Sequence, residues 1–251
     1  MFRLMRIEPP PQGWKAVAWE LVIVTLGVLI ALAAQQWAEE RNWSAKVAQS
    51  RLAIREELQK HYLFATEWRV VQPCIDAQLE RLRQRVEGSG ARLDPAPAYR
   101  DEALARFVVR LPAKDYVEGT WQAAIADGVA PRLEPKTRSL LIDHFAALDE
   151  LESNTAQTTQ LERSLVPLSR PIELTSDIRF TLLDRLEALQ TLSNFIDLQA
   201  GQVLYVVEQL GMKPDPATVR QFTERYGTYQ FCRANRLPMR SFAAAMVAIP
   251  N

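Results

Sequence analysis

One long apolar run interrupts a chain whose other segments mix hydrophobic and polar positions. The run LVIVTLGVLIALAA covers residues 21–34, and extending it back to Ala16 gives 19 residues. A helix of that length spans roughly 28 Å at about 1.5 Å per residue, close to the roughly 30 Å hydrocarbon core of a bilayer. The pattern predicts a transmembrane anchor over residues 16–37, preceded by a short tail over residues 1–15.

Tryptophans bracket this run on both sides. An indole ring is stable at the boundary between lipid and water, where its apolar body and its polar N–H are both accommodated. We therefore expect four interfacial anchors: Trp14, Trp19, Trp37 and Trp43.

Glu20 is the one charged residue of the predicted helix between Ala16 and Ala34. Its carboxylate lies near the helix end and can reach the headgroup layer, which needs no protein partner. A second interpretation follows from helical geometry, because Gly27, Ala31 and Ala34 lie within about 40° of Glu20 around the axis. Gly27 and Ala31 have the spacing that lets two helices approach closely in lipid. We call these four residues the small-residue face and predict that it packs on another membrane helix, in a second copy or in a different protein.

A cleaved signal peptide is the competing interpretation, since Ala31, Ala33 and Ala34 are small residues that signal peptidase accepts. The 20-residue lead before the run and the acidic Glu20 favour an uncleaved anchor. Basic residues occur on both sides and do not by count favour a cytoplasmic N-terminus, but a short tail ahead of such an anchor normally stays inside. We expect a single-pass protein of the bacterial inner membrane, with a cytoplasmic N-terminus and an extracytoplasmic C-terminal domain.

Beyond residue 38 the apolar positions recur at helical spacings of three and four. The span is expected to continue as a stalk helix up to Gly88, with a kink or short break around Val71 to Pro73, because proline has no amide hydrogen. Two heptad-like seams follow from this spacing. The first comprises Ile54, Leu58, His61, Ala65, Trp68, Gln72, Ile75, Leu79, Leu82 and Val86. The second comprises Leu182, Leu186, Leu189, Ser193, Ile196, Ala200, Val203, Val207 and Leu210.

Glycine and proline punctuate the remaining helices. An irregular connector is expected over residues 91–112, with one short helix around 101–109. Gly128 suits the end of a helix, Pro135 and Pro216 suit helix starts, and Asp215 suits an N-cap. The helices expected on this basis cover residues 117–127, 135–165, 176–210 and 216–226. The predicted class is all-α: a transmembrane helix, a long stalk helix and an antiparallel helical bundle over residues 38–240, with a C-terminal tail over 241–251.

Composition narrows the function classes. Apolar residues make up 48% and charged residues 24%, which is ordinary globular usage, and thirty basic residues balance thirty acidic ones. No stripe of Lys and Arg suited to a phosphate backbone is present, so nucleic-acid binding is discarded. Nine glycines and the lack of alternating β-branched stretches argue against a sheet protein.

The two cysteines, Cys74 and Cys232, are far apart and belong to no metal-binding pattern. In the cytoplasm they would be two unrelated buried thiols. In an exported domain they are better interpreted as one disulfide that ties the C-terminal segment to the first long helix.

Catalytic and cofactor motifs are missing from the sequence. His61 and His144 are the only histidines and have no partner pattern of a metal site, so we interpret them as core or surface residues. The uncharged stretch 153–160 puts Thr155 and Thr158 or Thr159 on a helix seam, where they either line a ligand pocket or bond back to the helix carbonyls. No enzyme activity, cofactor or metal is predicted.

The motif E-x(6)-G-x-L-I-A-L-x(4)-W, from Glu20 to Trp37, followed by an acidic residue and Arg41, resembles the N-terminus of a bacterial family of uncharacterised single-span membrane proteins. The chain has alanine and glutamine over 33–36, where those proteins usually show one or two asparagines. Residues 120–148 also resemble that family's second, weaker signature. The resemblance implies an uncleaved anchor and no activity.

The expected function is therefore a membrane-anchored structural or interaction module of the cell envelope, acting through helix–helix contacts, with the lipid bilayer and another membrane helix as partners. Two alternatives stay open. The helical bundle could sense a ligand and signal through a membrane partner, or a soluble periplasmic binding domain could be released by signal cleavage.

Overall fold

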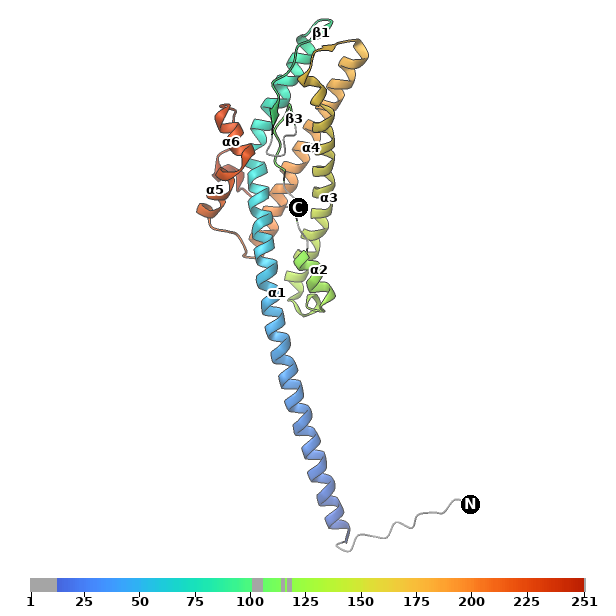
Figure 1. Cartoon of the computed structure of the whole chain (residues 1–251). Coiled ribbons are helices and arrows are strands. Elements are labelled where there is room, and N and C mark those ends of the chain that lie inside the picture. The colour runs from blue at the N-terminus through green and yellow to red at the C-terminus, as the bar shows by residue number, and fades with distance from the viewer. Residues whose placement is uncertain (1–12, 101–105, 114–115, 117–118, 251) are drawn as a thin grey trace, which may run out of the picture. The chain divides into compact units, whose positions relative to one another are not determined.

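The chain is described by a computed structural model that covers residues 13–100, 106–113, 116 and 119–250. It divides into two compact units, Met1–Ser50 and Arg51–Asn251. Within the described residues the chain is predominantly helical, with four two-residue strands, which confirms the all-α prediction (Figure 1). The predicted tail over residues 1–15 lies outside the described residues, except for its last three positions. The helices are α1 (Gly13–Gly88), α2 (Gly119–Ala126), α3 (Pro135–Ser164), α4 (Ser176–Gln209), α5 (Pro216–Arg225), α6 (Gly227–Ala234) and α7 (Phe242–Ala245).

Both predicted seams lie in the core of the second unit. Every member of the first, from Ile54 to Val86 on α1, is buried, including its polar members His61 and Gln72. The second is buried from Leu182 to Val207 on α4, and its final member is half-buried. The stalk is therefore core helix from Ile54 onward, because its apolar stripe is covered by other helices of this unit.

Contacts at both ends fix the direction of α4. The Tyr62 hydroxyl, early in α1, donates to Glu208 near the end of α4 at 3.1 Å, and the Arg179 guanidinium at the start of α4 donates to the Val86 carbonyl near the end of α1. Asn154 of α3 donates to Gln199 at 3.0 Å, and Arg185 donates to the Ser164 carbonyl at the end of α3. Helix α4 is thus antiparallel to α1 and to α3, which makes α1 and α3 parallel to each other (Figure 1).

An extended connector explains this parallel pair, since it returns along the unit before α3 begins. Strand β1 (Arg92–Leu93) pairs antiparallel with β4 (Ile172–Glu173), and β2 (Tyr99–Arg100) pairs with β3 (Arg106–Phe107). The short helix expected around 101–109 is wrong for residues 106–109, which form strand β3 and then a bend. Residues 101–105 lie outside the described part. The 3₁₀ turns η1 (Ala130–Arg132) and η2 (Val166–Ser169) complete the connections.

Local signals set the helix ends as predicted. Gly128 and Gly211 each lie two residues beyond the end of a helix, α2 and α4 respectively. They have φ of +70° and +67°, a conformation that glycine adopts without a Cβ penalty. The Asp215 carboxylate accepts hydrogen bonds from the amides of Ala217 and Thr218 and caps α5. Pro135 occupies the first turn of α3.

Helix α1 is continuous through Pro73, so of the kink or short break predicted around Val71–Pro73 the break is wrong. A proline leaves the carbonyl four residues earlier without its helical donor and crowds that turn. The C-terminal segment packs at this turn, and the Arg240 amide donates to the Val70 carbonyl at 2.9 Å. Tertiary packing thus supplies a hydrogen bond beside the site where the proline removes one.

Two short C-terminal helices were not predicted. Helix α6 is joined to α1 by a disulfide between Cys74 and Cys232, both fully buried. Residues 241–250, expected to be a tail, include α7, whose Ala245 is fully buried. The Ile249 amide donates to the Gly201 carbonyl of α4 at 3.0 Å, and a Cβ at Gly201 would lie only 2.5 Å from the Ile249 side chain. Only glycine therefore allows the C-terminus to approach α4 this closely.

We expect the double variant Cys74→Ala, Cys232→Ala to lower the free energy of unfolding by about 5 kcal/mol. The bond closes a loop with a sequence separation of 158 residues, and in the chain-entropy model its loss restores that freedom to the unfolded chain. Urea unfolding of the full-length protein in detergent, followed by circular dichroism, measures the change. Wild-type protein unfolded with reductant serves as the control, and an unchanged midpoint in both samples would contradict the expectation.

Candidate functional site

The first candidate site is the apolar part of α1 in the first unit. Its residues from Leu21 to Ala34 are all exposed, and large side chains such as Leu21 (67%) and Ile30 (61%) face outward with no protein covering them. Among the described residues, α1 is the one helix long and apolar enough to cross a membrane by length and composition. A helix that is apolar around its whole circumference is stable only when something other than water surrounds it.

Polar and aromatic side chains gather at the ends of this segment. Trp14 (85%), Trp19 (66%) and Trp37 (63%) are exposed, whereas Trp43 is half-buried. The Arg41 guanidinium lies 4.9 Å from the centre of the Trp37 ring, and the Lys46 ammonium lies 5.3 Å from that of Trp43. Each indole on the C-terminal side is therefore paired with a cation, an arrangement suited to a lipid headgroup layer.

No described residue of the protein covers the small-residue face. Glu20, Gly27, Ala31 and Ala34 are all exposed, and a Cβ built at Gly27 meets no atom within 4 Å. Nothing in the described residues therefore occupies the groove that these side chains leave. A second helix could approach this face closely at Gly27 and Ala31, since neither residue carries a bulky side chain.

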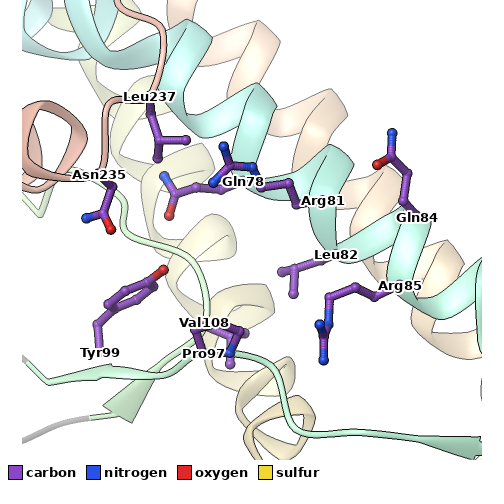
Figure 2. A pocket seen from close by; sticks show the side chains of 10 residues that line it. All are labelled: Gln78, Arg81, Leu82, Gln84, Arg85, Pro97, Tyr99, Val108, Asn235 and Leu237. Atoms are coloured by element: carbon purple, nitrogen blue, oxygen red, sulfur yellow. The ribbon is translucent and has the colours of Figure 1, made fainter.

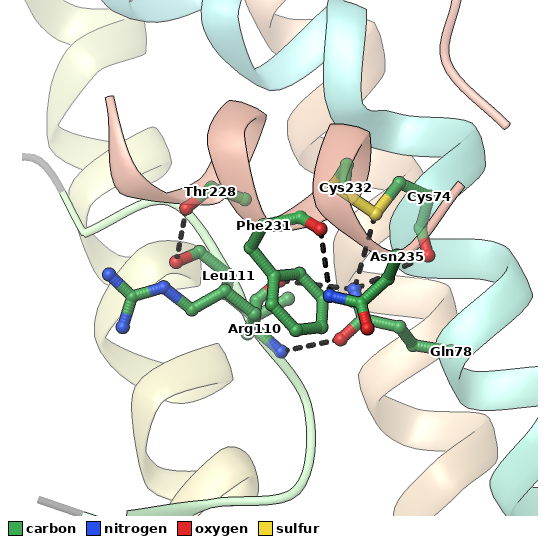
Figure 3. The surroundings of a disulfide bond; sticks show 8 residues. All are labelled: Cys74, Gln78, Arg110, Leu111, Thr228, Phe231, Cys232 and Asn235. Carbon is green, nitrogen blue, oxygen red and sulfur yellow. Dashed lines mark hydrogen bonds between the residues drawn. A yellow bond between two sulfur atoms is a disulfide. The ribbon is translucent and has the colours of Figure 1, made fainter. Parts of the chain in front are cut away.

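The second candidate site lies in the Arg51–Asn251 unit, where a group of polar contacts surrounds the disulfide (Figure 3). The buried Gln78 amide lies one turn after Cys74 and donates to the Cys74 carbonyl and to the Arg110 carbonyl, both at 3.3 Å. Its oxygen accepts from the Arg110 amide at 2.7 Å. From α6, the Thr228 hydroxyl donates to the Leu111 carbonyl at 3.1 Å. Helices α1 and α6 are thus bonded to the connector as well as to each other.

A pocket of about 450 Å³ opens next to the disulfide, between α1, the connector and the residues after α6 (Figure 2). Its apolar wall and its polar groups come from all three segments. The apolar wall includes Leu82, Val108 and Leu237, and the polar groups include Arg81, Tyr99 and Asn235. Neither the histidines nor the threonines singled out in the sequence line this pocket.

The two histidines meet in the core. His61 Nδ1 and His144 Nε2 are 3.1 Å apart, and the rings stack with an interplanar angle of 22°. Burial, together with the neighbouring His61, lowers the pKa of His144 to about 3, so its ring is neutral at physiological pH. No group of three potential metal ligands occurs among the described residues. The pair is a packed hydrogen-bonded contact between α1 and α3.

The threonine hydroxyls of α3 donate hydrogen bonds to carbonyls of their own helix. The Thr155 hydroxyl donates to the Leu151 carbonyl at 2.8 Å, and Thr158 and Thr159 both donate to the Thr155 carbonyl. Of the two sequence interpretations, the hydroxyls therefore follow the one in which they bond back to their own helix.

The pocket was missed at the sequence level. Arg81 and Asn235 are 154 positions apart, and no periodic pattern connects α1 to a two-residue strand and a helix end. The cysteine pair was the one available signal, because a bond between Cys74 and Cys232 brings the helical turn after Cys74 near the residues that follow Cys232.

Comparison with protein-family models, with curated proteins and with solved structures finds no match for this chain. Its function therefore has to be argued from its own residues.

Acid is expected to destabilise the second unit through His144. The folded-state pKa of about 3 lies below the unfolded value of about 6.5, so only the unfolded chain binds the proton between these values. The contribution of His144 to the free energy of unfolding is then fully present above pH 6.5 and decreases as the pH falls toward 3. The decrease is about 2 kcal/mol between pH 7 and 5. Urea unfolding at pH 7, 6 and 5 measures this slope. His144→Gln should flatten it, and an equally steep slope in that variant would contradict the assignment.

Proposed function

We propose that the protein is a single-pass membrane protein of the bacterial cell envelope that acts as a structural or interaction module. Residues 16–37 are its membrane anchor, and residues 38–240 form a helical bundle outside the bilayer. The observation that carries this proposal is the apolar stretch of α1, which is exposed along its whole length. Burial of this surface in lipid is strongly favourable, whereas its exposure to water is not.

The small-residue face supplies the interaction. Glu20 is costly in lipid without a polar partner, and Gly27 and Ala31 allow two backbones to approach closely. We therefore propose that this face binds another membrane helix, either in a second copy of the chain or in a different membrane protein. The bundle would then be held at the membrane surface in a defined assembly.

The disulfide supports an extracytoplasmic location for the bundle. Disulfides persist in oxidising compartments such as the periplasm and are rare in the reducing cytosol. Cys74 and Cys232 are bonded, and the bond lies after the apolar segment in the chain. An N-terminus in the cytoplasm and a C-terminal domain in the periplasm agree with both features.

A ligand-sensing bundle is the second candidate, favoured by the pocket beside the disulfide. In that case the signal would pass to a membrane partner. A soluble periplasmic binding domain, released by cleavage near Ala33 or Ala34, is the remaining alternative, and the first experiment below distinguishes it. The sequence offers no catalytic motif, so we propose no enzyme activity.

Full-length protein purified from native membranes should retain its N-terminal residues and resist extraction by alkaline carbonate. An uncleaved apolar helix keeps the chain in the bilayer, while a cleaved chain begins after Ala33 or Ala34. Intact mass spectrometry of the membrane and soluble fractions reads out both, and alkylation without reductant reports whether the cysteines are paired. A soluble chain that begins after Ala34 would overturn the anchor.

Ala31→Leu is expected to weaken association of the anchor by at least about tenfold, because a leucine side chain separates helices that small residues allow to touch. Ala33→Leu is the matched control, since it makes the same change about 160° away from Ala31 around the axis. Crosslinking of full-length protein in native membranes detects both self-association and a foreign partner. Equal complex formation in both variants and wild type would remove the small-residue face as the contact.

A further inference from the structure

Several residues that line the pocket beside the disulfide are held by packing contacts. Tyr99 lies edge-on against Phe231 of α6, with ring centres 4.4 Å apart, and Leu82 and Val108 are buried in the apolar wall. Figure 2 shows the Tyr99 hydroxyl pointing toward the middle of the pocket, which Arg81 lines from α1. The pocket is therefore lined by positioned side chains on three segments.

Some polar groups of this pocket already have partners. Gln78 is fully occupied by the Cys74 and Arg110 backbone, and the Arg85 guanidinium donates to the carbonyls of Asp94 and Pro95 at 3.0 and 2.9 Å. Two donors differ from these. Neither the Arg81 guanidinium nor the Tyr99 hydroxyl makes a hydrogen bond or ion pair to any of the described residues. They are the groups that a ligand would find ready to donate.

The charge of the lining has one sign. Arg81 and Arg85 are both cationic, and none of the residues that line the pocket is acidic. The nearest carboxylate along the helix, Glu80, is bonded to Arg83 at 2.6 Å on the exposed side of α1. A partly apolar cleft with a single sign of charge attracts ligands of the opposite sign.

We propose that this pocket binds a small organic anion whose carboxylate is held by Arg81 and whose apolar body rests against Leu82, Val108 and Leu237. Arginine presents two parallel N–H donors that match a carboxylate. The Tyr99 hydroxyl donates to the same carboxylate. Burial raises the pKa of Tyr99, so this hydroxyl keeps its proton at neutral and mildly alkaline pH.

The apolar wall selects the ligand class. An inorganic anion would satisfy Arg81 but would make no apolar contact with the three aliphatic side chains of the wall. A neutral apolar molecule would cover them but leave the guanidinium and the hydroxyl without an acceptor. A carboxylate attached to an aromatic or branched aliphatic body satisfies both parts, and its size suits a volume of about 450 Å³. This site is independent of the membrane contact proposed above.

Isothermal titration calorimetry on the full-length protein in lipid nanodiscs tests the proposal, with empty nanodiscs as the reference. The probes are 3-phenylpropionate and cyclohexanecarboxylate, with 3-phenylpropionamide, 3-phenylpropylamine and inorganic phosphate as comparisons. We expect saturable binding of the carboxylates below about 10 mM, and binding of each comparison weaker by at least about tenfold. No saturation by either carboxylate, or equal binding of the amide or the phosphate, overturns the assignment.

Variants locate the site. Arg81→Gln should weaken carboxylate binding by about tenfold or more, because it removes the charge and the paired donors. Tyr99→Phe should weaken it severalfold while keeping the ring that contacts Phe231. Arg83→Gln is the matched control, since Arg83 lies on the same helix but pairs with Glu80 and Glu87 outside the pocket. Circular dichroism verifies folding, and equal loss of binding in Arg81→Gln and Arg83→Gln would show a general charge effect instead.

Discussion

The middle of α1 is buried on every side, and the rest of the second unit is arranged to make that burial possible. Residues 65–72 are buried without exception, although they include Thr66, Glu67, Arg69 and Gln72. A helix covered all round usually carries apolar residues, because a buried polar group without a partner is costly. Here the polar groups are retained, and their partners come both from α1 itself and from the neighbouring elements. The Gln72 oxygen, for example, accepts from Trp68 on its own helix and from Ser193 on α4, both at 3.0 Å.

These bonds explain why the C-terminal segment is packed and not a loose tail. Arg69 donates to the Val247 carbonyl at 2.8 Å, Val70 accepts from the Arg240 amide, and Cys74 is bonded to Cys232. Arg240 in turn holds Asp197 of α4 through two contacts of 2.8 and 3.1 Å. Three consecutive parts of one α1 surface are therefore covered by residues more than 150 positions later. Burial of Arg69 lowers its pKa, and the nearby carboxylate of Asp197 opposes this shift.

The parts of this arrangement that could be predicted from the sequence have a regular spacing of apolar residues or a local signal at a helix end. Both seams, the capping at Asp215 and the glycine ends of α2 and α4 follow from local rules, and the structure agrees with them. The short helices α6 and α7, the strand pairs and the parallel course of α1 and α3 have no comparable signal, because two to eight residues are too few to show a periodicity. The break predicted at Pro73 is wrong because the energetic cost of a proline was judged for an isolated helix. A donor from Arg240, 167 positions away, cannot be foreseen from local sequence.

The pocket depends on the same long-range contacts, and Gln78 links them. Its amide bonds to Cys74 on one side and to the backbone of Arg110 on the other, so the position of the connector is fixed relative to the disulfide. The connector positions Val108 and Tyr99, and the bond at Cys232 positions Asn235 and Leu237. The cavity walls are thus set before any ligand arrives, and little conformational entropy remains to be lost on binding. Arg81 is exposed and makes no hydrogen bond to the described residues, so the ordering cost of binding falls mainly on this one side chain.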